Sequence, residues 1–438
     1  MPRRPRSRGL LPSFVLLAAA AFAPPTRAGD DAAKARAERN RGVSLHVRKE
    51  YALAVQAFTE AIRLDPKDPL AYFDRASAWA EIPDRERALA DFDRALALDP
   101  KLAAAYIGRG RLHAVRGEPT EALADYDRAV AADPKDSLAY FARAQARARS
   151  REYDAALSDY NQALALDPSS ALFYLSRGDL RRARGESAAA TDDFSRAIRL
   201  DPRLADAYDA RAAVAFDQGR HLDALGDFNK ALDVAPNDAS AHLGRATCLF
   251  ELHEYALSAE DYGRALEIDP RLIEARYGRA RALAQKGDLI AAAADYDEVL
   301  QEDPGYPSAH TGRGIVRLFQ ERYAAAAADL DAALGVDPDD AVAATHRARL
   351  LAAAPDAKLR DGARARTLAD HARELTRDVE PHALAALAAA EAELGRFEDA
   401  VAHQTKALEL LRDPDSRSRA RSRLDLYKRN EPLRDPAP

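Results

Sequence analysis

The sequence predicts an all-α protein built as a solenoid of helical hairpins, and two observations carry this prediction. The first is composition, because alanine, leucine and charged residues dominate and the bulk of the chain lacks the two-residue alternation of strands. The second is a proline that recurs every 34 residues, a period typical of stacked repeats. These prolines are Pro66, Pro100, Pro134, Pro168, Pro202, Pro236, Pro270, Pro304 and Pro338.

The N-terminal residues 1–28 have the features of a secretory signal peptide. An arginine-rich start, "MPRRPRSR", precedes the apolar run "LLPSFVLLAAAAFA", which is shorter than the roughly 20 residues of a membrane span. Small residues end at Ala28, where a signal peptidase would cleave. We therefore expect an exported protein, in the periplasm, the cell envelope or outside the cell, with a short lead at 29–34. A retained signal anchor is the alternative.

The charge balance narrows the class of partner. Removing residues 1–28 takes away five arginines and no acid, so the formal charge changes from −6 to −11. An acidic body argues against a nucleic-acid partner, because phosphates need a basic surface. The single cysteine, Cys248, cannot form an internal disulfide, and we expect it to be a small buried residue in a helix.

Each repeat is predicted to hold two helices. Numbering the repeats 1 to 34, with the proline at position 32, gives nine repeats over residues 35–340. Positions 1–14 and 18–31 can each form a helix of about four turns, and the proline step ends the second helix. Glycine at position 15 favours the left-handed backbone that ends the first helix. These glycines are Gly117, Gly185, Gly219 and Gly287.

When the nine repeats are aligned, four further positions of the repeat indicate how its two helices pack. Position 8 is glycine or alanine in all nine repeats, positions 20 and 27 are alanine in eight, and position 24 is aromatic in eight. Small residues let two backbones approach, and the aromatic ring fills the space between them. This pattern resembles the tetratricopeptide repeat family. The resemblance implies a right-handed superhelix of about eleven antiparallel hairpins that binds a protein or peptide segment on its concave face.

After Pro338 the period slips. We expect 341–380 to form an enlarged tenth hairpin, 381–414 an eleventh repeat-like hairpin, and 415–438 a capping helix and tail. Terminal repeats need a polar outer face, so this region is predicted to close the solenoid rather than to form a separate domain.

The resemblance also implies where a ligand binds. In the family, positions 2, 5, 9, 12 and 13 of the first helices form the ligand-binding side, here called the inner face. The implied peptide groove consists of Leu70, Phe73, Ile107, Arg111, Leu138, Phe141, Arg149, Leu172, Leu175, Arg182, Asp206, Asp209, Phe216, Asp217, Leu243, Phe250 and Tyr277. The alternative is that these residues pack between neighbouring helices.

Within this groove we predict one apolar anchor per repeat and a reversal of charge. The apolar row would meet every third residue of an extended ligand, and a basic stretch followed by an acidic one would fit a partner with ends of opposite charge. The row is Phe73, Ile107, Phe141 and Leu175. The basic residues are Arg111, Arg149 and Arg182, and the acidic ones are Asp206, Asp209 and Asp217.

A second charged pattern is predicted to be structural. Position 7 is arginine in all nine repeats, and position 23 is aspartate in the last eight. In an antiparallel hairpin these positions lie at similar heights, so we expect a ladder of Arg–Asp pairs, within a repeat or between neighbours, that fixes the register of the helices.

The sequence offers little for catalysis. It has no HExxH zinc motif, no phosphate loop and no Gly-x-Ser-x-Gly nucleophile motif, and the glycines of "TGRGIVR" (311–317) fall on a predicted helix. We expect no catalytic residue, cofactor or metal site, and no membrane span after signal cleavage.

The predicted function is a non-catalytic scaffold for a protein or peptide. The alternative is a structural spacer or self-assembling envelope component without a dedicated ligand.

Overall fold

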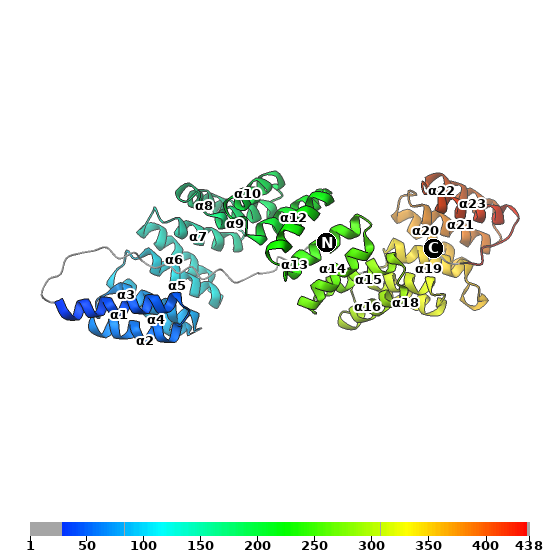
Figure 1. The fold of residues 1–438 in the computed structure, drawn as a ribbon. Helices are drawn as coiled ribbons and strands as arrows, with labels where there is room; N and C mark the ends of the chain where they lie inside the picture. The colour runs from blue at the N-terminus through cyan, green and yellow to red at the C-terminus, as the bar shows by residue number, and fades with distance from the viewer. Residues whose placement is uncertain (1–28, 83, 307, 436–438) are drawn as a thin grey trace. The chain divides into compact units, whose positions relative to one another are not determined.

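The structure, a computed structural model, describes residues 29–435 apart from Pro83 and Pro307. The signal peptide expected at 1–28 therefore lies outside the described residues. Within the described part, the secondary structure is helical throughout, with 23 α-helices, one short 3₁₀ helix and no strand. Figure 1 shows successive helices folding back on each other as hairpins. The predicted all-α solenoid of helical hairpins is confirmed.

The chain divides into two compact units, and the boundary between them along the sequence follows Ala207, inside one helix. We call Met1–Ala207 the N-terminal unit and Tyr208–Pro438 the C-terminal unit. The N-terminal unit holds α1 Gly29–Val47, α2 Tyr51–Leu64, α3 Pro69–Glu81, α4 Arg85–Leu98, α5 Ala103–Arg116, α6 Pro119–Ala132, α7 Ser137–Arg149, α8 Tyr153–Leu166, α9 Ala171–Ala183 and α10 Ser187–Leu200. The boundary falls in α11, Ala205–Asp217.

The C-terminal unit continues the same hairpins. It holds α12 His221–Val234, α13 Ala239–Glu251, α14 Tyr255–Ile268, α15 Ile273–Lys286, α16 Leu289–Glu302, α17 Ala309–Phe319, α18 Tyr323–Val336, α19 Ala341–Ala353, η1 Ala357–Leu359, α20 Gly362–Leu375, α21 Pro381–Glu393, α22 Phe397–Leu410 and α23 Pro414–Lys428. Two bounds differ from the prediction. The residues expected as a lead (29–34) are the first turns of α1, and α17 starts two residues late, after Ser308 in a left-handed backbone.

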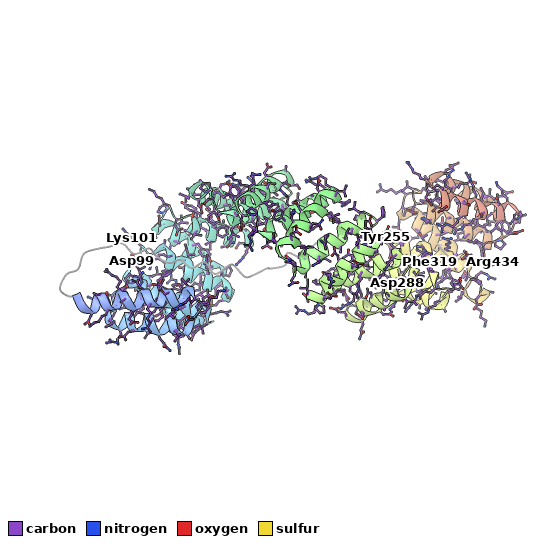
Figure 2. The ribbon with its side chains drawn as sticks, in the orientation of Figure 1. Asp99, Lys101, Tyr255, Asp288, Phe319 and Arg434 are labelled. Carbon is purple, nitrogen blue, oxygen red and sulfur yellow. The ribbon has the colours of Figure 1, made fainter. Side chains whose placement is uncertain are left out.

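In eight of the nine repeats an aspartate precedes the proline and organises the turn between hairpins; the sixth repeat has Ala235 there. After α4, the Asp99 carboxylate accepts a hydrogen bond from the backbone amide of Lys101 at 2.9 Å, and Figure 2 labels both residues. Aspartate forms such turns readily, because its side chain reaches the amide two residues on. The same bond is made by Asp65, Asp133, Asp167, Asp201, Asp269, Asp303 and Asp337.

The turn inside each hairpin uses a left-handed residue at position 15. The four glycines predicted there have φ between 73° and 90°, which confirms the prediction. Lys49, Arg151, His253 and Glu321 occupy the same position with φ near 60°, although side chains disfavour this conformation. The packing of the hairpin therefore fixes the backbone, and glycine only relieves its strain.

The aromatic ring at position 24 locks two successive repeats together. Phe58 is fully buried, and a Cβ atom added to Gly42, at position 8 of the same repeat, would lie 2.5 Å from its ring. Phe92 comes equally close to Gly108, at position 6 of the next repeat. The predicted role of small residues at position 8 is confirmed, and position 6 is a second packing position that the column analysis missed.

The region after residue 340 shares its core with the repeats before it. Leu318 and Leu330 pack in one cluster with Ala343 and Leu350 of α19. At the other end, Tyr427 of α23 is fully buried. The apolar side chains of 341–435 also pack among themselves in a cluster that includes Leu351 and Tyr427, and α19 joins that cluster to the repeats before it.

Candidate functional site

The predicted apolar anchors are wrong as ligand contacts. Phe73, Ile107, Phe141 and Leu175 are all at most 7% exposed. The Phe73 ring packs on Phe92 with centroids 6.0 Å apart, and the Phe141 ring stacks on Phe173 at 4.5 Å. Position 5 therefore lies in the seam between helices, and for these four residues the alternative of packing between helices is correct.

The remaining apolar residues of the predicted groove are half-buried. Leu138 and Leu172 pack against one hydrophobic cluster of the N-terminal unit. In the C-terminal unit, half-buried side chains pack in the same way against the clusters of their own repeats. These are Phe216, Leu243, Phe250 and Tyr277. Leu70 is half-buried as well. Such side chains offer only an edge to a ligand.

The charged residues of the predicted groove are the accessible ones. Arg149, Arg182, Asp206 and Asp217 are exposed, whereas Arg111 and Asp209 are half-buried. Asp206 belongs to the N-terminal unit, and the other two aspartates belong to the C-terminal unit. The predicted reversal of charge is therefore not a feature of one compact unit, and it stays a prediction.

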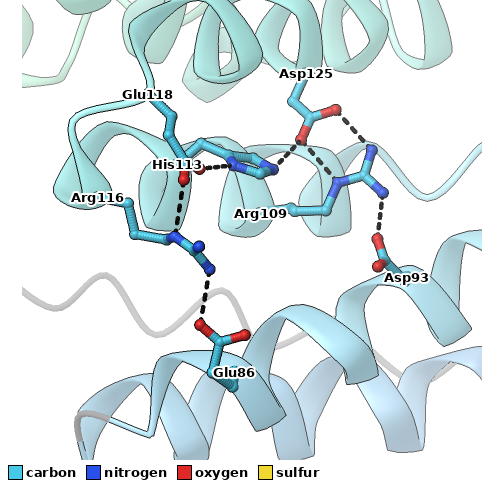
Figure 3. Close-up of polar contacts among 7 residues, drawn as sticks. All are labelled: Glu86, Asp93, Arg109, His113, Arg116, Glu118 and Asp125. Atoms are coloured by element: carbon cyan, nitrogen blue, oxygen red, sulfur yellow. Dashed lines mark hydrogen bonds and ion pairs between the residues drawn. The ribbon is translucent and has the colours of Figure 1, made fainter.

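The Arg–Asp ladder is present, and each of its bidentate pairs lies within one hairpin; Figure 3 shows the pair of Arg109 and Asp125. Arg109 donates from Nε and Nη2 to the two carboxylate oxygens of Asp125, at 2.8 and 2.7 Å. Its third nitrogen, Nη1, donates to Asp93 of the preceding repeat at 2.5 Å. Asp125 is buried and Asp93 is exposed. One guanidinium group thus ties its own hairpin together and binds the neighbouring one.

The same bidentate pair recurs in eight repeats, which confirms the predicted ladder. Its nitrogen–oxygen distances run from 2.6 to 3.2 Å. The other seven pairs are Arg75–Asp91, Arg143–Asp159, Arg177–Asp193, Arg211–Asp227, Arg245–Asp261, Arg279–Asp295 and Arg313–Asp329. A bidentate pair fixes geometry as well as charge, so the ladder serves the fold.

Two inner-face arginines of the N-terminal unit differ from the ladder. In the described part of the chain, Arg111 and Arg149 make no ion pair or hydrogen bond through their guanidinium groups. Burial lowers the pKa of Arg111. Both arginines act on the Tyr126 hydroxyl: burial raises the pKa of Tyr126 to about 12, and the two positive charges oppose this shift. Burial and the charge of Asp179 raise the pKa of Tyr160, and the charge of Arg149 opposes this shift.

A related cluster surrounds Arg281 in the C-terminal unit. Its guanidinium group lies 4.2 Å from the ring centroid of Phe250 and 5.9 Å from that of Tyr277. The Tyr277 ring contacts Tyr296 and Tyr306, with centroid distances of 5.9 and 5.0 Å. The Arg281 charge opposes the rise in pKa that burial causes in these three tyrosines. The rings therefore hold a cation at position 9 of the inner face.

Column analysis missed these clusters because it treated all aromatic residues at position 24 as equal. Tyrosine stands there in repeats 3, 4, 7 and 8, as Tyr126, Tyr160, Tyr262 and Tyr296. Arginine occurs at position 9 only as Arg111 in repeat 3 and Arg281 in repeat 8. This joint occurrence of a hydroxyl and a guanidinium group was the available signal. Together the two groups supply hydrogen-bond donors and positive charge, which suit a carboxylate.

Cys248 is fully buried, as expected, and burial raises the pKa of its thiol to about 12. Over the described residues, no three His, Cys, Asp or Glu side chains gather as metal ligands. The helices between residues 29 and 435 include none that is both long and apolar enough to cross a membrane.

Comparison with known proteins identifies the repeats. A family model described as tetratricopeptide repeat matches residues 16–69, 70–137, 141–205, 210–273 and 274–307. No curated protein matches the chain.

Solved structures with related folds include yeast Tom70, at 17% identity over 91% of this chain and 96% of that one, with a TM-score of 0.38. A tetratricopeptide repeat protein from Parabacteroides merdae is 20% identical over 57% of this chain and 99% of that one, with a TM-score of 0.45. YrrB, described as a TPR protein with an unusual peptide-binding site, is 26% identical over 43% of this chain and 96% of that one, with a TM-score of 0.36. Since the family model covers more than half of the sequence, this chain belongs to the tetratricopeptide repeat family.

Proposed function

We propose that this protein is a non-catalytic scaffold that binds a segment of another protein on the inner face of its repeats. Tetratricopeptide repeats are typically protein–protein interaction scaffolds, which supports the general role. The observation that carries the proposal is the contrast between two sets of arginines. The ladder arginines are each held by an aspartate, whereas Arg111 and Arg149 of the inner face have no carboxylate partner among the described residues.

The contact surface that we propose is polar with apolar edges. Aromatic anchors at position 5 are unavailable, because those side chains fill the core. Half-buried Leu138 and Leu172 and the 62% exposed Val115 supply apolar area beside the arginines. A few such residues provide most of the affinity in typical interfaces.

Site-specific photo-crosslinking tests the scaffold role. A photoreactive residue at Val115, at position 13 of the inner face, is expected to trap a defined partner. The matched control is Leu53, which is 47% exposed but lies on the second helix of its hairpin. Equal crosslinking from both positions, or crosslinks only to copies of this chain, would favour the structural spacer.

We further propose that the protein acts in the cell envelope or outside the cell, on the basis of residues 1–28. Mass spectrometry of the native protein is expected to find a new N-terminus near Gly29 in an envelope or secreted fraction. An intact Met1 in a cytoplasmic fraction would contradict export and leave the scaffold role standing.

A further inference from the structure

We propose that residues 431–435, here called the tail, are a built-in ligand of the C-terminal unit: the tail occupies the inner face of the last hairpins, and a partner segment that carries a leucine followed by an arginine takes its place. This inference rests on the proposed function, because it takes the inner face as the binding side. It adds a second binding place and the chemistry of its ligand.

The tail packs on inner-face positions of two hairpins. Continuing the repeat numbering from residues 341 and 381 places four alanines of α19 and α21 at positions 9, 12 and 13. All four are at most 1% exposed, and they share one hydrophobic cluster with Leu433 of the tail. They are Ala352, Ala353, Ala389 and Ala392. At position 13 of two earlier repeats, by contrast, Val115 is 62% and Phe319 is 49% exposed. The tail therefore lies where a ligand of the inner face would lie.

Two neighbouring side chains of the tail contact the last hairpins. Leu433 is buried in the cluster, and Arg434 donates from Nη1 to Glu393 Oε2 at 2.7 Å. The other oxygen of Glu393, at the end of α21, accepts a hydrogen bond from Arg360 Nε at 3.1 Å. The carboxylate is thus held in place by the fold and presented to the tail. These contacts recognise a leucine followed by an arginine.

The backbone of the tail adds little to this attachment. Pro432 has no amide hydrogen, and the amides of Leu433 and Arg434 donate no hydrogen bond to any residue that the structure describes. Elements of a fold normally pair their buried backbone groups. Because side chains hold this segment, its release breaks no backbone pairing, and a competing segment with the same two side chains can replace it.

The surface that the tail follows continues to an exposed aromatic residue. The end of the tail acts on the preceding hairpin, since burial, Glu321 and the charge of Asp435 together raise the pKa of Tyr323 at the start of α18. Phe319 precedes the same hairpin turn, and Figure 2 labels both Phe319 and Arg434 in the C-terminal unit. A longer partner segment can therefore add an apolar contact at Phe319, which helps it to displace a tethered tail of high effective concentration.

Charge supports a basic partner segment. The acceptor in the groove is the carboxylate of Glu393, and the chain as a whole has a formal net charge of −6. A segment that carries arginine is attracted by both, whereas an acidic segment is repelled. The ligand class is therefore an extended, basic segment with a leucine anchor.

A fluorescent peptide with the sequence of residues 429–438 tests the groove by anisotropy. In the full chain with Leu433→Ser/Arg434→Ser, here called the released-tail variant, the tail no longer competes. This variant is expected to bind the peptide at least about tenfold more tightly than the unmodified chain. The matched control, Leu410→Ser/Arg412→Ser, removes the same side chains from exposed positions at the end of α22 and is expected to stay within about twofold of the unmodified chain. Equal affinities in all three would overturn the built-in ligand.

Changes on both sides of the groove test its chemistry in the released-tail variant. A peptide with serine in place of its leucine is expected to bind about tenfold more weakly. Adding Glu393→Gln is expected to weaken the arginine peptide several-fold and to leave a peptide with glutamine in place of that arginine unchanged. If Glu393→Gln weakens both peptides equally, the arginine is not recognised there and the ligand class is wrong.

A second measurement uses the chain with its own tail in place. A fluorophore on a cysteine added after Pro438 reports the freedom of the tail, because the native Cys248 is buried. Excess unlabelled peptide is expected to lower its anisotropy, and the serine peptide is not. An unchanged anisotropy, or a released-tail variant that no longer melts cooperatively, would make the tail a fixed part of the fold and overturn the proposal. Crosslinking from Val115 in the N-terminal unit is unaffected by either result, so the scaffold role keeps its own test.

Discussion

At the scale of single residues, the burial of a charged side chain decides how much its ion pair contributes to the stability of the fold. Arg109 pairs with two carboxylates that differ in this respect. Asp125 is buried inside the same hairpin, whereas Asp93 is exposed on the neighbouring repeat. Exposed ion pairs contribute little, since water and salt screen them. Removing a buried partner instead leaves a poorly solvated charge behind.

We therefore expect Asp125→Ala to destabilise its hairpin by about 3 kcal/mol and Asp93→Ala by about 0–1 kcal/mol. Both substitutions remove a carboxylate from the same guanidinium group, so Asp93→Ala is the matched control. Hydrogen exchange at the amides of α5 and α6 measures the local stability. Equal protection in the two variants would mean that the ladder is a set of solvated charges.

A half-buried histidine, His346, gives the C-terminal unit a dependence on pH. Burial lowers the pKa of His346 to about 4, and the nearby His382 adds to this shift. Because the folded pKa lies below the unfolded value near 6.5, the unfolded chain binds more protons between these two values. This contribution to stability is complete above pH 6.5 and is lost as the pH falls towards 4.

Lowering the pH from 7 to 4 is expected to destabilise the structure around α19 through His346 by roughly 3 kcal/mol. His346→Leu is expected to reduce this loss, whereas His371→Leu, at the more accessible His371 on α20, leaves it unchanged. Hydrogen exchange of α19 against pH makes the comparison. An identical pH profile for the His346→Leu variant and the unmodified chain would refute the assignment.

At the scale of elements, one ring at position 24 meets two helices, and its contacts set the size allowed at positions 6 and 8. A glycine that faces such a ring has no room for a side chain, while a glycine on the outer side of a helix only weakens that helix. The same substitution is therefore expected to change stability in opposite directions at two sites.

Gly178→Ala would place a Cβ atom 2.5 Å from the Phe194 ring and is expected to destabilise the N-terminal unit by about 1–3 kcal/mol. Gly226→Ala, in the interior of α12 with nothing within 4 Å, is expected to stabilise the C-terminal unit by about 0.5–1 kcal/mol. Thermal unfolding followed by circular dichroism measures both. Shifts of the same sign would contradict the role of the ring.

At the scale of the whole molecule, the two compact units should respond separately to truncation. Deleting 381–438 removes α21 to α23 and uncovers Leu351 and Ala365, which pack against them in one cluster. We expect the C-terminal unit to aggregate or melt earlier, because a solenoid end without its cap exposes apolar surface. Hydrogen exchange in α1 to α9 of the N-terminal unit is expected to stay unchanged. A monomeric truncated chain with its original melting behaviour would show that this region is not a cap.

The sequence by itself determined the repeat, the hairpin and the ladder, because each depends on local spacing. A proline every 34 residues ends the helices, glycine marks the left-handed turn, and an arginine and an aspartate 16 residues apart face each other in any antiparallel hairpin of this length. Such features follow from covalent geometry and hydrogen bonding within one repeat.

Only the tertiary structure decided which inner-face side chains are accessible. Phe73 and Arg111 both belong to the inner-face positions, yet the first is buried against Phe92 and the second keeps its charge unpaired. This outcome depends on how closely neighbouring repeats stack, which the ring at position 24 and the small residue at position 6 set together. The division into two units after Ala207 could not be predicted from the 34-residue period either. It depends on the contacts between repeats, whereas the period reflects only the spacing within the sequence.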